Sequence, residues 1–177
     1  TSIMTLDDIS DNIILVDSVS KRYSVCGARI GLIASYNKKI MDAVLKFAQA
    51  RLSSPTIEQV GAQAGIEMDL SYFKPILKEY EKRRNAVLDG LHKIPGVVCE
   101  TPGGAFYCIA KLPIDNAEKF AKWMMTDFSH EGESVLVAPA EGFYTTPGLG
   151  VDEVRISYVL EVPKLKRAME LLGIAIE

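Results

Sequence analysis

The segment of residues 18–31 holds the side chains of this sequence that could do chemistry together. It contains one lysine, Lys21, two nearby hydroxyls on Ser18 and Ser20, and one arginine, Arg29. A lysine amine that lies near a cation on a desolvated rim has a lowered pKa and can act as a nucleophile. Hydroxyl groups and a guanidinium are the groups that hold a phosphate. We therefore expect an amine nucleophile beside a phosphate site.

The residues before this segment predict the element that positions it. Residues 13–16 read Ile-Ile-Leu-Val, an unbroken apolar run that is typical of a strand buried on both faces of a parallel sheet. We expect a strand over residues 13–19, which places residues 18–21 at its carboxyl end. Ligands bind at that edge in open α/β sheets. An amine nucleophile next to a phosphate site there indicates a Schiff base with pyridoxal phosphate.

The same segment resembles the lysine-attachment signature of the class I and II aminotransferases, which are fold type I pyridoxal phosphate enzymes. That signature runs small-apolar-small-Lys, two free positions, small-apolar, one free position, Gly, one free position and Arg-apolar-Gly. Every specified place is filled, by Ser18, Val19, Ser20, Lys21, Ser24, Val25, Gly27, Arg29, Ile30 and Gly31. One departure is Ala28, where many relatives carry an aromatic residue. A full match of this kind argues against a solvated loop lysine at position 21.

The resemblance implies a role for each of these side chains. Lys21 would hold pyridoxal 5′-phosphate as a Schiff base, and Ser18, Ser20 and Arg29 would bind its phosphate. The family also places an arginine that binds the substrate α-carboxylate in an apolar-Arg-apolar-Ser strand before the last helix. Arg155 stands in Val-Arg-Ile-Ser and matches that position. An arginine in mid-strand must reach solvent or hold an anion, and the resemblance favours the anion.

Composition narrows the function classes. The 177 residues are 48% hydrophobic and 24% charged, with a net charge of -3, as in an ordinary globular protein. Such a charge gives no argument for binding nucleic acid or an anionic membrane, and no apolar stretch has the length of a membrane span. Three cysteines without metal spacing predict a reduced, cytoplasmic protein. His92 and His130 lie far apart, so no metal site is predicted.

Periodicity and turn signals predict an α/β protein in two parts. Residues 1–72 are interpreted as the C-terminal segment, or tail, of the large pyridoxal phosphate-binding α/β/α domain of a fold type I aminotransferase. Residues 73–177 are interpreted as its small α+β C-terminal domain, which the chain enters through a long helix. The expected strands are residues 13–19, 29–35, 97–101, 105–110, 134–138 and 152–159, the second antiparallel to the first. The expected helices are residues 37–52, about 55–65 and 69–94, then 115–128, and a last helix closed by Gly173.

Several local expectations follow from capping and packing rules. Ser54 is expected to cap the second helix, and Asp115 with Glu118 forms a predicted capping box for the fourth. The long helix should bury one stripe, with Arg84 reaching solvent at its edge. That stripe consists of Leu70, Phe73, Leu77, Tyr80, Val87 and Leu91.

Two loops of the second part resemble substrate-side elements of the family. Gly103-Gly104 followed by Ala105, Phe106 and Tyr107 resembles its Gly-Gly-small-aromatic element. Phe106 and Tyr107 fit equally well as ordinary aromatics of a sheet core. Residues 139–143 resemble the family's Pro-Gly-x-x-Phe loop, with Ala140 in place of the glycine.

The resemblance implies transamination between an L-amino acid, aspartate-like or aromatic, and a 2-keto acid, in a homodimer. The family's remaining cofactor residues would lie before Thr1, so we interpret the chain as a C-terminal part that is inactive by itself. Two alternatives stay open. A carbon-sulfur β-lyase of the same fold uses the same lysine signature, and a non-catalytic fragment or regulatory domain could retain the fold.

Overall fold

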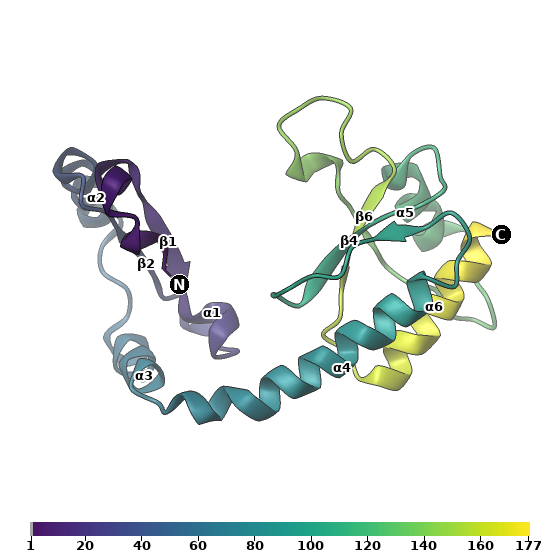
Figure 1. Ribbon diagram of the computed structural model, residues 1–177, viewed down its shortest axis with the longest axis horizontal. Helices are drawn as coiled ribbons and strands as arrows, with labels where there is room; N and C mark the ends of the chain where they lie inside the picture. The colour runs from purple at the N-terminus through teal and green to yellow at the C-terminus, as the bar shows by residue number, and fades with distance from the viewer. Residues whose placement is uncertain (1) are drawn as a thin grey trace. The chain divides into compact units, whose positions relative to one another are not determined.

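The computed structural model describes residues 2–177, which divide into two compact units, Thr1–Leu70 and Ser71–Glu177 (Figure 1). We call them the first unit and the second unit, and each is described by itself. Within residues 2–177, none of the helices combines the length and the apolar character that crossing a bilayer requires.

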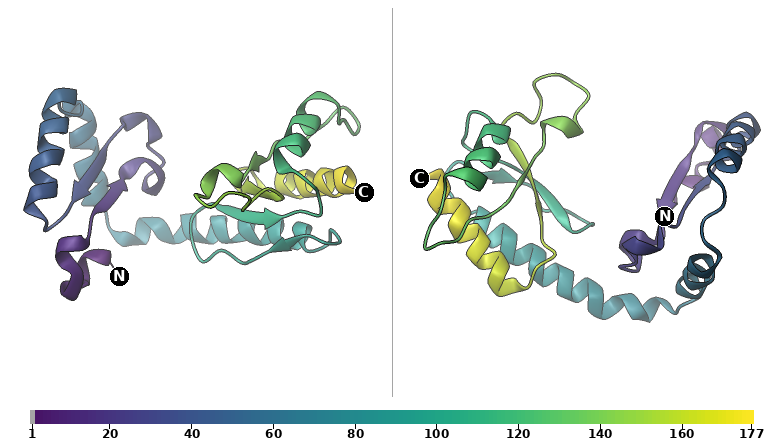
Figure 2. Two further views of the ribbon diagram at one scale, coloured as in Figure 1. Left: turned by 90° about the horizontal axis from the view of Figure 1, so that it is seen from above. Right: turned by 180° about the vertical axis from the view of Figure 1, so that it is seen from behind.

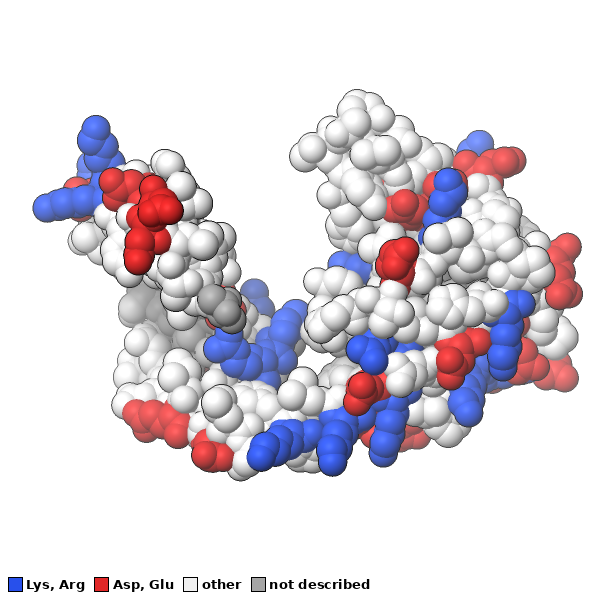
Figure 3. Space-filling view, viewed as in Figure 1, with Lys and Arg blue, Asp and Glu red and all other residues white. Residues whose placement is uncertain are grey.

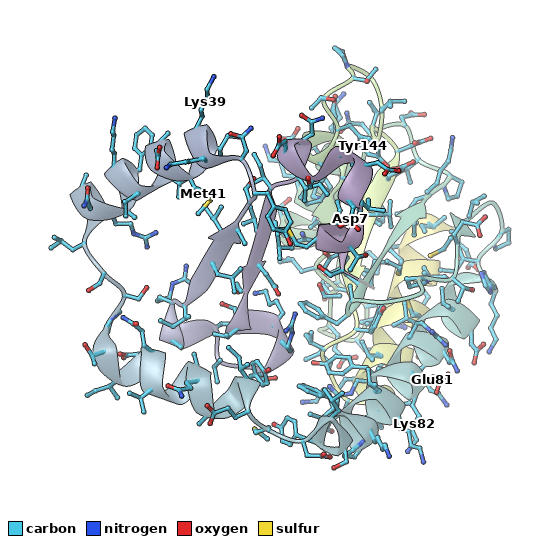
Figure 4. The ribbon with its side chains drawn as sticks, turned by 60° about the vertical axis from the view of Figure 1, so that its left-hand side comes forward. Asp7, Lys39, Met41, Glu81, Lys82 and Tyr144 are labelled. Atoms are coloured by element: carbon cyan, nitrogen blue, oxygen red, sulfur yellow. The ribbon has the colours of Figure 1, made fainter. Side chains whose placement is uncertain are left out.

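The first unit consists of short strands, single turns and two helices. Its elements are η1 (Ile3–Thr5), η2 (Asp7–Asn12), β1 (Leu15–Ser18), α1 (Val19–Arg22), η3 (Cys26–Ala28), β2 (Gly31–Ala34), α2 (Lys38–Arg51) and α3 (Thr56–Ile66). The strands β1 and β2 pair antiparallel, with Val16 opposite Ile33. Helix α2 lies beside this pair of strands (Figure 2). Met41 is on the side of α2 that faces the strands, and Lys39 points away from them (Figure 4).

The expected burial of the first strand was wrong. In the described residues β1 pairs with β2 alone, and the side chain of Val16 is 71% exposed. A two-stranded ribbon with a helix along one side only leaves its other face in water, so the apolar run does not become a core. The buried residues in the described part of this unit are Ile13, Val19 and Ser20.

The caps of the two helices differ in how well the sequence predicted them. Asn37 caps α2, because its Oδ1 accepts a hydrogen bond of 3.2 Å from the backbone N–H of Ile40. For α3 the predicted cap, Ser54, was wrong by one residue. Pro55 itself takes the extended cap conformation, with ψ 139°, and its carbonyl accepts from Gln59 N at 3.1 Å. A proline at this place leaves the helix start without a side-chain cap.

The second unit is a four-stranded antiparallel sheet with three helices. After η4 (Leu70–Tyr72), its elements are α4 (Phe73–Leu91), β3 (Val98–Cys99), β4 (Tyr107–Lys111), α5 (Ala117–Thr126), β5 (Ala138–Pro139), η5 (Glu141–Phe143), β6 (Glu153–Ser157) and α6 (Val162–Ile176). The strand order is β3-β4-β6-β5. Along β6, Val154 and Ile156 are buried while Arg155 is on the opposite face, which confirms the predicted alternation.

One face of this sheet carries the core of the second unit. Residues of α4, α5 and α6 pack in a single hydrophobic cluster with that face. The most deeply buried large side chains of the second unit are Val87, Leu91, Leu112, Met124, Val154, Tyr158 and Leu172. The other face, with Tyr107, Ile109 and Arg155, remains partly open. The chemistry-bearing residue of β6 therefore lies on the open face.

Helices α4 and α6 run side by side (Figure 1), and their contact explains the glycine at position 90. A Cβ on Gly90 would lie 2.4 Å from Cβ of Met169, and one on Gly173 would lie 3.5 Å from Cγ1 of Ile94. The expectation that Gly173 closes the last helix was wrong, because α6 continues to Ile176. Gly173 packs against Ile94 instead of ending the helix.

The long helix is shorter than predicted and buries two of the six residues of its stripe. Val87 and Leu91 are fully buried, whereas Leu70 and Leu77 are 77% and 66% exposed. The core of the second unit covers the C-terminal half of α4, and Leu70 and Leu77 do not belong to its hydrophobic cluster. The polar side of α4 carries a row of basic residues, which is visible in Figure 3. Glu81 and Lys82 of this helix point outward (Figure 4).

Two further expectations needed correction in this unit. Asn116 caps α5 through a hydrogen bond of 2.9 Å from Lys119 N, so the capping box of Asp115 and Glu118 was wrong by one residue. The strand expected over residues 134–138 shrinks to β5, and residues 141–143 form the short helix η5.

Candidate functional site

Lys21 and Ser18 lie together where β1 becomes α1. Ser18 caps α1, because its Oγ accepts a hydrogen bond of 3.0 Å from Ser20 N. The Ser18 backbone N–H donates to Oδ1 of Asp17 at 2.7 Å, which fixes the turn from strand to helix. An open cavity of about 470 Å³ is lined by Val16, Asp17, Ser18, Lys21 and Arg22. The structure thus brings the predicted amine and one predicted hydroxyl into one cavity.

The Lys21 amine is exposed and is held by a neighbouring thiol. Its Nζ donates to Sγ of Cys26 across 3.6 Å, and that thiol in turn donates to the Ser20 carbonyl at 3.3 Å. The expectation of a desolvated lysine was wrong for the described residues, since Lys21 remains open to solvent. Cys26 occupies a free position of the signature, so this contact could not be predicted from the sequence.

Arg29 and Ser20 do not line the cavity of Ser18 and Lys21. Arg29 has a left-handed backbone with φ 54°, and its Nη1 donates to the carbonyl of Cys26 at 3.1 Å. Ser24 is also left-handed, with φ 56°. Left-handed backbone at residues other than glycine costs on the order of 1–3 kcal/mol and gathers at functional sites. The loop between α1 and β2 therefore combines strain with the predicted phosphate ligand.

An ion pair that the sequence did not predict borders the same cavity. Arg22 Nη2 lies 2.7 Å from Oδ2 of Asp17, and both side chains are partly exposed. Asp17 precedes the signature and Arg22 stands at one of its free positions, so the signature predicts a role for neither residue. This pair ties α1 to the end of β1.

Arg155, in the second unit, has an unusual environment. Its guanidinium carbon lies 4.8 Å from the ring centre of Phe143 and 5.4 Å from that of Tyr107. Among the described residues its Nε is buried without a hydrogen-bond partner. A buried donor that is left unpaired costs about 1–3 kcal/mol, and an anion would remove that cost. The guanidinium therefore lies near two aromatic rings and keeps a donor that could bind a carboxylate or phosphate.

Phe106, which precedes β4, and Tyr107, its first residue, have different surroundings, a point that the sequence left open. Phe106 packs against the core of the second unit. Tyr107 is 40% exposed and lies over Arg155. Phe143 comes from the loop that resembles Pro-Gly-x-x-Phe, and its contact with Arg155 could not be read from spacing. Arg84, which was expected to reach solvent, has a side chain that is 24% exposed, and its Nη1 donates to the Pro102 carbonyl at 3.4 Å.

A second contact fixes the loop that carries Phe143. The Tyr144 hydroxyl donates to Oε2 of Glu153 at 2.5 Å, and this bond to a carboxylate raises the pKa of Tyr144. Gly150 has φ +75°, and a Cβ there would lie 2.6 Å from the Tyr144 ring. The loop therefore needs glycine at 150, so that Tyr144 can reach Glu153 of β6. Phe143, whose ring lies near Arg155, is the residue before Tyr144.

Comparisons with known proteins agree on one family. The family model of aminotransferase class I and II matches residues 2–172. A putative aminotransferase of Bacillus subtilis is 29% identical over 172 residues, which are 96% of this chain and 42% of that protein. The chain therefore spans about two fifths of the length of the curated relatives it matches.

Solved structures give the same result for the fold. An aspartate aminotransferase from Thermotoga maritima has a TM-score of 0.79 and 28% identity, over 98% of this chain and 42% of that one. An aromatic aminotransferase from Pyrococcus horikoshii has a TM-score of 0.80 and 28% identity, over 97% of this chain and 45% of that one. The chain belongs to the class I and II aminotransferase family, and the predicted fold type I is confirmed.

Proposed function

We propose that this chain is the C-terminal part of a pyridoxal phosphate-dependent aminotransferase. Residues 1–72 are then the last segment of the large cofactor-binding domain, and residues 73–177 are the small domain. The reaction is amino-group transfer between an aspartate-like or aromatic L-amino acid and a 2-keto acid. The observation that carries the proposal is Lys21, an exposed primary amine at the junction of β1 and α1, beside the Ser18 hydroxyl. The names of the relatives support the substrate class.

The residues of the first unit fit pyridoxal phosphate. An accessible amine and a hydroxyl in one open cavity are the groups that an aldehyde bearing a phosphate requires. Pyridoxal phosphate supplies an aldehyde for a lysine amine and a ring that withdraws electrons from the substrate. Lys21 would hold it covalently and would carry the proton at the substrate Cα. Ser18, Ser20 and Arg29 hold the phosphate.

Arg155 binds the substrate α-carboxylate in this proposal. Its planar fork can hold a carboxylate through two parallel hydrogen bonds, which fixes the orientation of the bonds at Cα. The buried and unpartnered Nε between Phe143 and Tyr107 supports this role.

The state of the protein follows from the same proposal. The active enzyme is a cytoplasmic homodimer, and the free thiols Cys26, Cys99 and Cys108 are compatible with a reducing compartment. The 177-residue chain alone is inactive, since it spans about 42% of its relatives and leaves Lys21 exposed. Tests of activity therefore need a protein that carries this chain together with the segment that precedes it in the relatives.

Borohydride reduction of that protein with pyridoxal phosphate tests the lysine. We expect the reduced label on Lys21, and Lys21→Ala should abolish turnover because the covalent ligand and the proton carrier vanish together. Lys39→Gln is the matched control, since Lys39 points away from β1 and β2. A label on Lys74 or Lys111 in place of Lys21 contradicts the assignment.

Kinetics of an arginine variant test the substrate site. Arg155→Lys keeps the charge but loses the fork, so kcat/KM should fall by about 30-fold, which is about 2 kcal/mol. Arg83→Lys is the control, because Arg83 also lies over a tyrosine but has an ion-pair partner, Glu79. A change below about threefold for every amino acid contradicts the role of Arg155. Release of ammonia and a keto acid without an amino acceptor identifies a β-lyase instead.

A further inference from the structure

The amine of Lys21 lies next to a second nucleophile, the thiol of Cys26, which the proposed function does not use. Lys21 Nζ and Cys26 Sγ are 3.6 Å apart, and both residues are exposed. The remaining cysteines, Cys99 and Cys108, are buried in the second unit. A reagent in solution therefore meets one accessible thiol in this chain, and an amine lies next to it.

Hydrogen bonds to the backbone fix the position of Cys26 in this pair. The Ser20 carbonyl accepts from Cys26 Sγ at 3.3 Å and from the backbone N–H of Val25 at 3.1 Å. Ser20 is adjacent to Lys21 in α1 and is itself buried. Cys26 is thus fixed over the end of α1, while the flexible four-carbon stem of Lys21 can adjust the distance between nitrogen and sulfur.

We propose that Lys21 and Cys26 are a two-point capture site for small aldehydes. The amine adds to the carbonyl carbon, the carbonyl oxygen leaves as water, and the thiol sulfur bonds to the same carbon. One amine, one thiol and one aldehyde give an N–C–S bridge, with the two displaced protons leaving in the water molecule. No electrons are exchanged, so no oxidant or reductant is needed.

Capture of this kind occupies the amine of Lys21, which makes the pair a modification site. The proposed function also places a Schiff base on Lys21, so the pair is open to capture where that amine carries no cofactor; the inference itself needs only the two nucleophiles. Proximity is its physical basis, because a thiol held beside an amine reacts with the bound carbon as an intramolecular group.

Labelling of the 177-residue chain with o-phthalaldehyde, without added thiol, is the test. This dialdehyde joins one amine and one adjacent thiol into a fluorescent isoindole. We expect fluorescence and a cross-linked peptide that contains Lys21 and Cys26. Cys26→Ser and Lys21→Gln should each lower the fluorescence by about tenfold or more, whereas Lys39→Gln should leave it unchanged.

A second arm excludes effects of a variant on folding. The wild-type chain, alkylated at Cys26 with iodoacetamide before labelling, should lose the fluorescence to the same extent. Formaldehyde on the untreated chain should join the two peptides with a mass gain of one carbon atom. Fluorescence above half of the wild-type value in Cys26→Ser, or formaldehyde adducts without this link, would overturn the proposal.

Discussion

The two units contain similar amphipathic helices but differ in what those helices bury. In the first unit, α2 and α3 contain no buried residue, and Phe47 and Ile57 are 78% and 84% exposed. In the second unit, Leu91 of α4 and Leu172 of α6 are completely buried. A hydrophobic stripe therefore shows which face of a helix can be buried, and a packing partner decides whether it is.

The difference also shows where stability resides. The second unit has one continuous cluster drawn from three helices and the sheet, whereas the first unit has three buried residues in its described part, Ile13, Val19 and Ser20. Large exposed apolar surfaces mark contact sites for other protein segments. We expect the first unit to open locally while the second stays folded.

Hydrogen exchange on the whole chain should show the largest effect. Amides of α2 and α3 should exchange about 100-fold faster, or more, than those of β4 and α6, because local opening of an uncovered helix costs little. Mass spectrometry of peptic peptides measures this difference. Equal protection of α2 and α6 would break the comparison between the units.

A pair of substitutions on one helix gives the next largest effect. Leu91→Ala should lower the free energy of unfolding by about 2–5 kcal/mol, because it opens a cavity in the core. Leu77→Ala on the same helix should change it by about 0.5 kcal/mol or less, since Leu77 is 66% exposed. Urea unfolding followed by circular dichroism measures both. Similar losses for the two variants would show that the first half of α4 is also packed.

Alanine at two helical glycines should act in opposite directions. Gly90→Ala would place its Cβ 2.4 Å from Met169, and such overpacking costs about 1–3 kcal/mol. Gly61→Ala in α3 meets nothing within 4 Å and should favour the helix by about 0.4–1 kcal/mol. The melting temperature reports the first change, and helical ellipticity reports the second. A stabilising Gly90→Ala would contradict the close contact of α4 with α6.

The smallest expected effect is a pH dependence in the core of the second unit. Burial raises the pKa of Tyr158 above its ordinary value of 10.0. The fold favours the neutral phenol. The contribution of Tyr158 to the free energy of unfolding is therefore complete below pH 10.0 and is lost as pH rises through the raised pKa. The free energy of unfolding of Tyr158→Phe should therefore fall less at alkaline pH than that of the wild type.

Urea unfolding at two pH values measures that decline, one near neutrality and one above the ordinary pKa of tyrosine. Tyr36→Phe is the control, since Tyr36 is 61% exposed in the first unit. An equal alkaline decline in wild type and Tyr158→Phe would assign the loss of stability to other groups.

Elements were predicted better than their ends. Helices α2 and α4 and the strand β6 lie where periodicity placed them, because alternation of apolar residues follows directly from helix and strand geometry. The caps of α3 and α5 were missed by one residue. Capping depends on the dihedral angles of single residues, and several neighbouring polar residues could satisfy it.

The candidate site, like the fold, was only partly predictable from the sequence. The signature around Lys21 is local in sequence, so residue types and spacing were enough to single it out, and the roles assigned to Ser18, Ser20, Lys21, Arg29 and Arg155 remain proposals. The contact of Lys21 with Cys26 and the rings over Arg155 were not predictable. Phe143 and Tyr107 approach Arg155 through separate segments of the chain, which only the folded sheet brings together.

The sequence by itself determined the family signature, the positions of the main helices and strands, and the face of β6 that carries Arg155. Tertiary structure decided which apolar stripes are buried, why Gly90 must lack a side chain, and that Arg155 Nε is left without a partner among the described residues. The physical reason is that periodicity is set by neighbours along the chain. Burial and contact are set by elements that are distant in sequence.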